Sequence, residues 1–169
     1  DPLLSGATGS VSHTEEVPSF LPDRFEPGTP NIPGILGLHA ALCDLEQTDM
    51  GKLHQHELEL TQYFINGLMQ MDPSESTLRA IGKHNTIERT SVVSVQTLQT
   101  DMARVAYEMD DTYGIMTRVG LHCAPSAHKT LGTYPEGTIR FSFGPENTHH
   151  EVDLALHALA EITGSPYHL

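Results

Sequence analysis

The hydrophobic positions of the chain change their spacing along its length, and each spacing predicts one kind of element. Apolar residues recur every three or four positions between residues 35 and 45, and again from about 52 to 71. This spacing is typical of helices that bury one face. Gly51 separates the two stretches, and Asp72 precedes a proline, which disfavours helical dihedral angles. The pattern therefore predicts two successive helices.

Other stretches have the composition or the alternation of strands. Residues 77–81 and 90–98 predict two strands, the second rich in β-branched side chains. Residues 113–117 have the pattern of a turn that feeds a strand, and residues 138–143 alternate as a half-buried strand does. The segment between the last two is predicted to be a loop with a short helical piece after Pro125.

Two more helices follow from their end signals. Asp101 suits the N-cap of a helix that runs to about residue 111, and Gly114 suits its end. Thr148 suits the N-cap of a helix over 149–162. The complete order predicts an α+β fold, a small and mostly antiparallel sheet with helices packed on one face.

The first 34 residues differ from the rest of the chain. They are rich in Gly, Pro, Ser and Thr, which disfavours a helix or a central strand, yet Phe20 and Phe25 need burial. We therefore expect residues 1–34 to form an extended arm on another surface and residues 35–169 to form the small domain. The glycine-rich stretch 6–10 lacks the lysine and spacing of a P-loop, so a tight turn is favoured over a phosphate cradle.

Composition restricts the partners and the compartment. A net charge of −13 disfavours nucleic acid and anionic membranes as partners. Two cysteines are too few for a disulfide framework, which favours a cytoplasmic protein, and the spacing of Cys43 suggests a core position. His54 and His56 lie two positions apart and point to different sides of a helix, so no metal site is expected and both are interpreted as solvated.

The richest group of reactive side chains lies between Arg118 and Arg140. Cys123 sits at the front of the loop, close in sequence to Arg118, His122 and Lys129. Cationic neighbours favour the thiolate, which is the nucleophilic form of cysteine. The residues alone leave two interpretations open, a nucleophile or a small buried apolar side chain.

Five stretches carry a family resemblance. They are GATGS (6–10), LPDRFEPGTPNIPGI (21–35), RVGLHCAPSAHKTLG (118–132), GTIRFSF (137–143) and ENTHHEVD (146–153). In this order they resemble the C-terminal part of a class V aminotransferase-fold enzyme of the cysteine desulfurase and selenocysteine lyase branch. The resemblance covers nearly the whole chain, and it implies that residues 1–34 comprise the arm and a residual segment of the large domain.

The resemblance implies pyridoxal phosphate (PLP) chemistry in a homodimer. Cys123 matches the nucleophile that attacks the sulfur of a bound substrate such as L-cysteine, leaving alanine and an enzyme persulfide. Arg140 matches the group that binds the substrate carboxylate, with Arg118 and His122 expected beside it. Gly28 and Thr29 match the segment that reaches the cofactor phosphate of the partner subunit. A sulfur-acceptor protein is a further expected partner.

The cofactor-binding half of such an enzyme is expected outside this sequence. The resemblance places the Schiff-base lysine, the acidic partner of the pyridine nitrogen and the ring-stacking residue before Asp1. Lys129 belongs to the cysteine loop and is not assigned as the Schiff base. We therefore expect PLP in the intact enzyme, whereas this chain alone is expected to be inactive and without it. Two alternatives stay open: a class V aminotransferase, epimerase or β-lyase in which Cys123 is incidental, or a non-catalytic partner-binding module.

Overall fold

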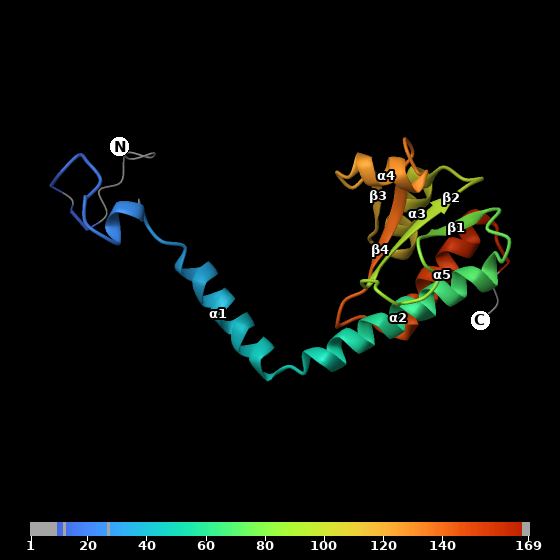
Figure 1. Cartoon of the computed structure of the whole chain (residues 1–169), viewed down its shortest axis with the longest axis horizontal. Coiled ribbons are helices and arrows are strands. Elements are labelled where there is room, and N and C mark those ends of the chain that lie inside the picture. Colours follow the sequence, from blue (N-terminus) through green and yellow to red (C-terminus); the bar gives the residue numbers. More distant parts are fainter. Residues whose placement is uncertain (1–9, 12, 27, 167–169) are drawn as a thin grey trace. The chain divides into compact units, whose positions relative to one another are not determined.

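The chain divides into two compact units after Asp49. The structure is a computed structural model that describes residues 10–11, 13–26 and 28–166 (Figure 1). The first unit comprises residues 1–49 and the second comprises residues 50–169. The sequence pattern placed the boundary earlier, between residues 34 and 35, because the helix that begins there has the apolar spacing of a packed element.

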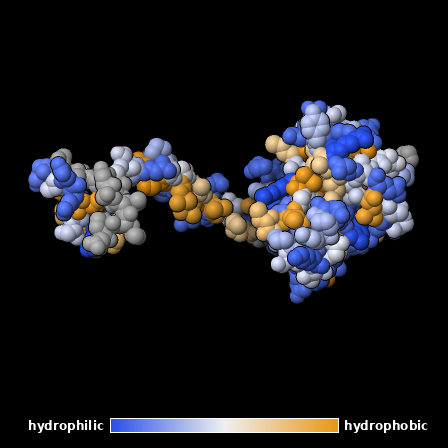
Figure 2. Space-filling view, turned by 90° about the horizontal axis from the view of Figure 1, so that it is seen from above, coloured by the Kyte–Doolittle hydropathy of each residue, from blue (hydrophilic) through white to orange (hydrophobic). Residues whose placement is uncertain are grey.

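The first unit contains a short 3-10 helix, η1 (Asp23–Phe25), and helix α1 (Ile32–Gln47). The Asn31 side chain caps α1 by accepting a hydrogen bond of 3.1 Å from the Gly34 amide. No residue of α1 is buried, and Figure 2 shows hydrophobic side chains along it. The large exposed apolar residues of α1 are Ile32, Ile35, Leu36, Leu38, Leu42 and Leu45.

The prediction that Cys43 lies in a core is wrong for the residues that this structure describes. Cys43 is half-exposed, and its Sγ lies 3.8 Å from both ring nitrogens of His39, one helical turn earlier. Periodic spacing shows that one side of α1 is apolar, but no described residue of its own unit covers that side.

The second unit is a four-stranded antiparallel sheet with the order β1-β2-β4-β3. This confirms the predicted α+β fold. The strands are β1 (Leu78–Ile81), β2 (Val92–Thr97), β3 (Arg118–Gly120) and β4 (Thr138–Ser142). The helices are α2 (Met50–Met71), α3 (Met102–Tyr113), α4 (Pro125–Leu131) and α5 (His149–Thr163).

The helix ends follow the signals in the sequence. Asp101 accepts a hydrogen bond of 2.8 Å from the Arg104 amide and begins α3, and Gly114 ends α3 with a φ of 67°. Thr148 and Glu151 form a reciprocal capping box at the start of α5. These caps fix where the two helices begin.

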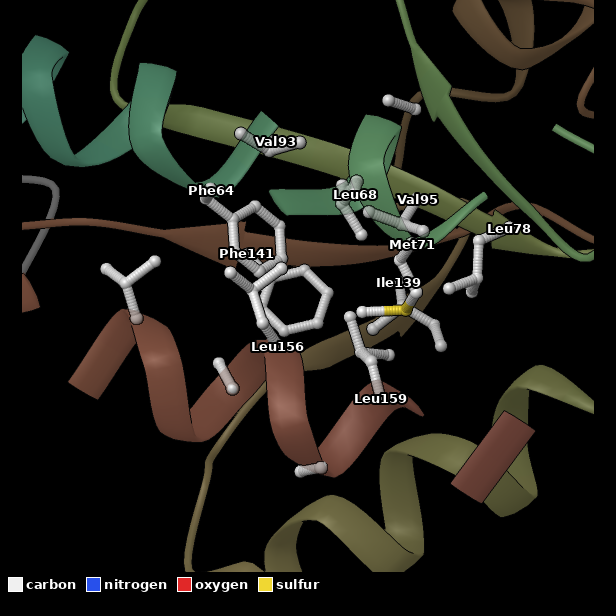
Figure 3. Close-up of a cluster of buried hydrophobic side chains, with 14 of the residues drawn as sticks. Phe64, Leu68, Met71, Leu78, Val93, Val95, Ile139, Phe141, Leu156 and Leu159 are labelled. Atoms are coloured by element: carbon white, nitrogen blue, oxygen red, sulfur yellow. The ribbon is translucent and has the colours of Figure 1, made fainter. Parts of the chain in front are cut away.

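Helices α2, α3 and α5 cover one face of the sheet and enclose the core (Figure 1). The Phe64 ring of α2 lies 4.7 Å from the ring of Phe141 in β4, measured between centroids. Leu156 of α5 packs so closely on Gly67 of α2 that a Cβ there would lie 2.3 Å from a Leu156 methyl carbon. Figure 3 shows this cluster between the two helices and the strands.

The opposite face of the sheet is polar. Ile139 and Phe141 of β4 point into the core, so their neighbours Thr138 and Arg140 point the other way. Arg140 is paired in register with Ser94 on one side and with Arg118 on the other. We call this the polar face. Its residues used below are Arg79, Ser94, Gln96, Arg118, Gly120, Thr138 and Arg140.

Candidate active site

Cys123 lies in a tight turn that follows β3 directly. The Ala124 amide donates a hydrogen bond of 2.8 Å to the Leu121 carbonyl, which closes a β-turn over Leu121–Ala124. Both central residues are left-handed, with a φ of 51° at His122 and 60° at Cys123. Turns of this kind favour glycine or asparagine at those positions. Each such non-glycine residue costs on the order of 1–3 kcal/mol, so the surroundings hold this turn in place.

Arg118 places a cationic group beside the thiol. Cys123 is exposed, and its Sγ lies 3.9 Å from Nη2 of Arg118. Arg118 is the first residue of β3, so a strand rather than the loop positions its side chain. A guanidinium at this distance is suited to pair with a thiolate or a persulfide anion.

Arg118 and Arg140 face each other across two antiparallel strands. Like charges in directly opposite positions destabilise a sheet, so an anion bound between the two arginines would be attracted by both. The Nε of Arg140 is buried and makes no hydrogen bond with any described residue. A guanidinium binds a carboxylate through two parallel hydrogen bonds, which makes a carboxylate a fitting ligand here.

The side chain of His122, a central residue of the turn, contacts β4 and α4. Its Nε2 is 3.1 Å from Oγ1 of Thr138, and its ring centroid is 5.7 Å from that of His128. Burial lowers the pKa of His122, and the charges of Arg140, His128 and Arg118 lower it further. His122 is therefore neutral at pH 7. Its contacts within this chain are with protein groups, so the predicted contact with substrate stays a prediction.

The remaining predicted binding residues belong to the first unit. Gly28 and Thr29 are exposed, and Gly28 has a φ of 89°. Their contact with the cofactor phosphate of a partner subunit stays a prediction. The glycine-rich stretch falls almost wholly on residues 6–9, which lie outside the described residues.

The described lysines do not form a PLP site. Lys83 pairs with Glu88 at 2.8 Å, and Lys129 is exposed with its Nζ 5.1 Å from the centroid of the Tyr134 ring. Lys52 is exposed near the start of α2. A Schiff-base lysine needs a shaped site that also holds the ring and phosphate of the cofactor. That the PLP-binding lysine lies elsewhere in the intact enzyme stays a prediction.

Two further observations concern metal ions and membranes. Within the described ranges, no three His, Cys, Asp or Glu side chains are grouped in a way that could hold a metal ion. None of the helices formed by described residues is both long enough and apolar enough to span a membrane.

Sequence reasoning missed the residues that support the turn. Thr138 is 1% exposed and holds His122, and Gln96 and Gly137 contact each other next to it. The alternation of β4 placed Thr138 on the polar face. No local signal indicated its partner, because His122 lies 16 positions away.

Comparison with solved structures identifies the class of enzyme to which this fold belongs. The chain superposes on the apo structure of a cysteine desulfurase from Thermococcus onnurineus NA1 with a TM-score of 0.75 and 32% identity. The match covers 97% of this chain and 40% of that one. Residues 1–155 match the aminotransferase class-V family, a family of PLP-dependent enzymes, and the chain belongs to it.

Sequence relatives agree with this assignment. The chain is 33% identical over 151 residues to a probable cysteine desulfurase of Staphylococcus epidermidis, covering 89% of this chain and 35% of the relative. It is 34% identical over 144 residues to a probable cysteine desulfurase of Pyrococcus abyssi, covering 85% of this chain and 34% of the relative. The chain thus spans little more than a third of the length of these relatives.

Proposed function

We propose that this chain is the persulfide-forming part of a PLP-dependent cysteine desulfurase that acts on L-cysteine. The observation that carries the proposal is the placement of Cys123, an exposed thiol on a strained turn, 3.9 Å from Arg118. Thiols used in catalysis are accessible and have cationic neighbours, whereas structural cysteines are buried. The names of the relatives support the same activity.

Cys123 acts as the nucleophile. Its thiolate attacks the sulfur of the substrate, a sulfur–sulfur bond forms, and the bond between that sulfur and the substrate Cβ breaks. The electron pair stays with the carbon, which gains a proton, so the products are alanine and a persulfide on Cys123. PLP, held by the rest of the intact enzyme, supplies the electron withdrawal that this cleavage needs.

The two arginines bind different anionic groups. Arg140 binds the substrate carboxylate, because its half-buried guanidinium has a buried Nε without a partner among the described residues. Arg118 stabilises the anionic sulfur of Cys123 before and after transfer. His122 remains beside the substrate region as a neutral group of the turn.

The intact enzyme is proposed to be a cytoplasmic homodimer. Gly28 and Thr29 reach the cofactor phosphate of the partner subunit, because a left-handed glycine lets the backbone approach a phosphate closely. Both cysteines are free thiols in the structure, as is usual in a reducing compartment. A sulfur-acceptor protein takes the persulfide sulfur from the exposed Cys123.

Sulfide release from L-cysteine tests the role of Cys123 in the intact enzyme. Cys123→Ser is expected to abolish release while the visible absorbance of bound PLP persists. Cys43→Ser is the matched control, because Cys43 is the other free thiol and lies in the first unit. Full activity of Cys123→Ser would overturn the proposal and favour a class V transaminase, epimerase or β-lyase.

Substitution of Arg140 tests the carboxylate contact separately. Arg140→Lys keeps the charge but loses the bidentate geometry. A hydrogen bond between charged groups contributes about 1.5–3 kcal/mol, so KM for L-cysteine should rise on the order of 10- to 100-fold. An unchanged KM would assign the carboxylate to another residue.

A further inference from the structure

A chain of hydrogen bonds crosses the polar face and ends at the carbonyl of Gly137, close to the start of the cysteine turn. Arg79 of β1 donates to the side-chain oxygen of Gln96 in β2. Gln96 in turn donates from Nε2 to the carbonyl of Gly137, at 3.3 Å. Gln96 is only 7% exposed, so both of its polar atoms are used inside the protein.

Gly137 connects this chain of bonds to the residue that precedes the turn. It has a φ of 83°, and a Cβ placed on it would lie 2.3 Å from the carbonyl carbon and oxygen of Gly120. Gly120 is the last residue of β3, and the turn begins at the next residue. The position of Gly137 therefore limits where the turn can start.

The turn needs support of this kind because its own bonds are few. The backbone bond from Ala124 to Leu121 closes it, and the contacts of His122 with Thr138 and of Cys123 with Arg118 join it to the strands. Thr138 follows Gly137 directly in the chain, so the partner of His122 and the neighbour of Gly120 move together. Strained conformations persist only where the surrounding structure restricts them from several sides.

We propose that Gln96 is a positioning residue for Cys123. By donating a hydrogen bond to the Gly137 carbonyl, Gln96 fixes the backbone against which Gly120 packs. This keeps the strained turn, and with it Cys123, beside Arg118. The Gln96 side chain bonds to Arg79 and to Gly137, so it acts on the thiol only through the backbone. The expected effect of Gln96 on catalysis rests on the proposed function, whereas its expected effect on the structure of the turn does not.

Gln96→Glu separates the two ends of the hydrogen-bond chain. A glutamate has the same shape and still accepts from Arg79, but it puts an acceptor beside the Gly137 carbonyl where the donor was. Gln99→Glu is the matched control, because Gln99 Nε2 donates 3.2 Å to the backbone carbonyl of Ser76, an interaction that does not involve the turn. Gln96→Met, also similar in length, removes both bonds without adding charge.

Hydrogen–deuterium exchange of the intact enzyme is the primary measurement. A hydrogen bond contributes about 0.5–1.5 kcal/mol, so amides of residues 120–124 should exchange about two- to tenfold faster in Gln96→Glu and Gln96→Met. Gln99→Glu should leave them unchanged. Equal exchange in all three variants, or faster exchange spread evenly over the second unit, would overturn the proposal.

Kinetics distinguish this proposal from the proposed function. We expect kcat for sulfide release to fall in Gln96→Glu while KM for L-cysteine stays near its original value, because Arg140 is untouched. Faster exchange with unchanged kcat would show that the turn does not need this support for catalysis. Activity of Cys123→Ser would instead refute the desulfurase role and leave the exchange result standing.

Discussion

The two faces of the sheet are built by the same strands but differ in the polarity of their side chains. In β4, Ile139 and Phe141 are buried against helices, whereas Thr138 and Arg140 point to the polar face. The core face is closely packed and apolar. The polar face places two arginines opposite each other beside a strained turn. Successive residues of a strand point to opposite faces, so neighbouring positions in β4 serve either the core or the candidate site. Substitutions on the core face should mainly lower stability, and those on the polar face should mainly affect the site.

The largest effect is expected on the core face of α5. Leu156→Ala should lower the free energy of unfolding by about 2–5 kcal/mol, because Leu156 is fully buried against Gly67. Leu154 lies on the same helix and is 46% exposed, so Leu154→Ala should change the free energy of unfolding by about 0.5 kcal/mol or less. Urea unfolding of the intact enzyme measures both. Similar losses in the two variants would contradict the assignment of the core.

The core face is also the part that the sequence predicts best. The alternation of residues 138–143 predicts a half-buried strand and Thr148 predicts the start of a helix, and Ile139 and Leu156 are buried in these two elements. The caps at Asp101 and Thr148 are local signals, and the structure confirms both. Such features depend on neighbours in the chain, so a single sequence contains the information.

Features that depend on distant neighbours were predicted less well. Helices α1 and α2 have similar apolar spacing, but Phe64 is fully buried and α1 has no buried residue. Spacing identifies an apolar side without naming the surface that covers it. For the same reason His56, predicted to be solvated, instead places its Nε2 2.8 Å from the carbonyl of Asn147, 91 positions later.

The site divides in the same way. Cys123, Arg118 and Arg140 were predicted from their motif, and their roles stay predictions, whereas the register that pairs the two arginines is seen only in the structure. The left-handed turn was not predicted, because neither histidine nor cysteine is a turn signal. The contact of Gln96 with the Gly137 carbonyl joins positions 41 apart and requires the fold to be known.

A smaller effect is expected at Asp72, where α2 leads into β1. Burial alone would raise the pKa of Asp72, but hydrogen bonds from the amides of Leu78 and Thr77 and from the hydroxyls of Ser74 and Ser76 lower it to about 2. The folded state therefore favours the carboxylate. The resulting stability, on the order of 2 kcal/mol, is present above pH 4 and is lost as the pH falls toward 2.

Asp72→Asn provides the comparison for this pH dependence. The difference in unfolding free energy between the original protein and Asp72→Asn should be largest near pH 7 and shrink between about pH 4 and pH 2. Urea unfolding at a series of pH values measures it. A difference that stays constant over this range would show that the carboxylate is not stabilised by folding.

The smallest effect on stability is expected on the polar face, at Thr138. Thr138→Val removes the hydroxyl that contacts His122 at 3.1 Å and keeps the shape of the side chain. Because His122 is neutral at pH 7, the lost bond joins two uncharged groups and should lower the free energy of unfolding by about 1 kcal/mol.

Thr117 supplies the matched control for this substitution. Its hydroxyl is buried and makes no hydrogen bond with any described residue, so Thr117→Val should be neutral or slightly stabilising. Urea unfolding measures both variants, and equal losses would show that the contact with His122 adds nothing. Suppose that Thr138→Val lowers the free energy of unfolding by only about 1 kcal/mol and Leu156→Ala lowers it by more. The contacts of the polar face with the cysteine turn then contribute little to the stability of the fold. The residues of the polar face can then be varied to change the reactivity of Cys123 without unfolding the domain.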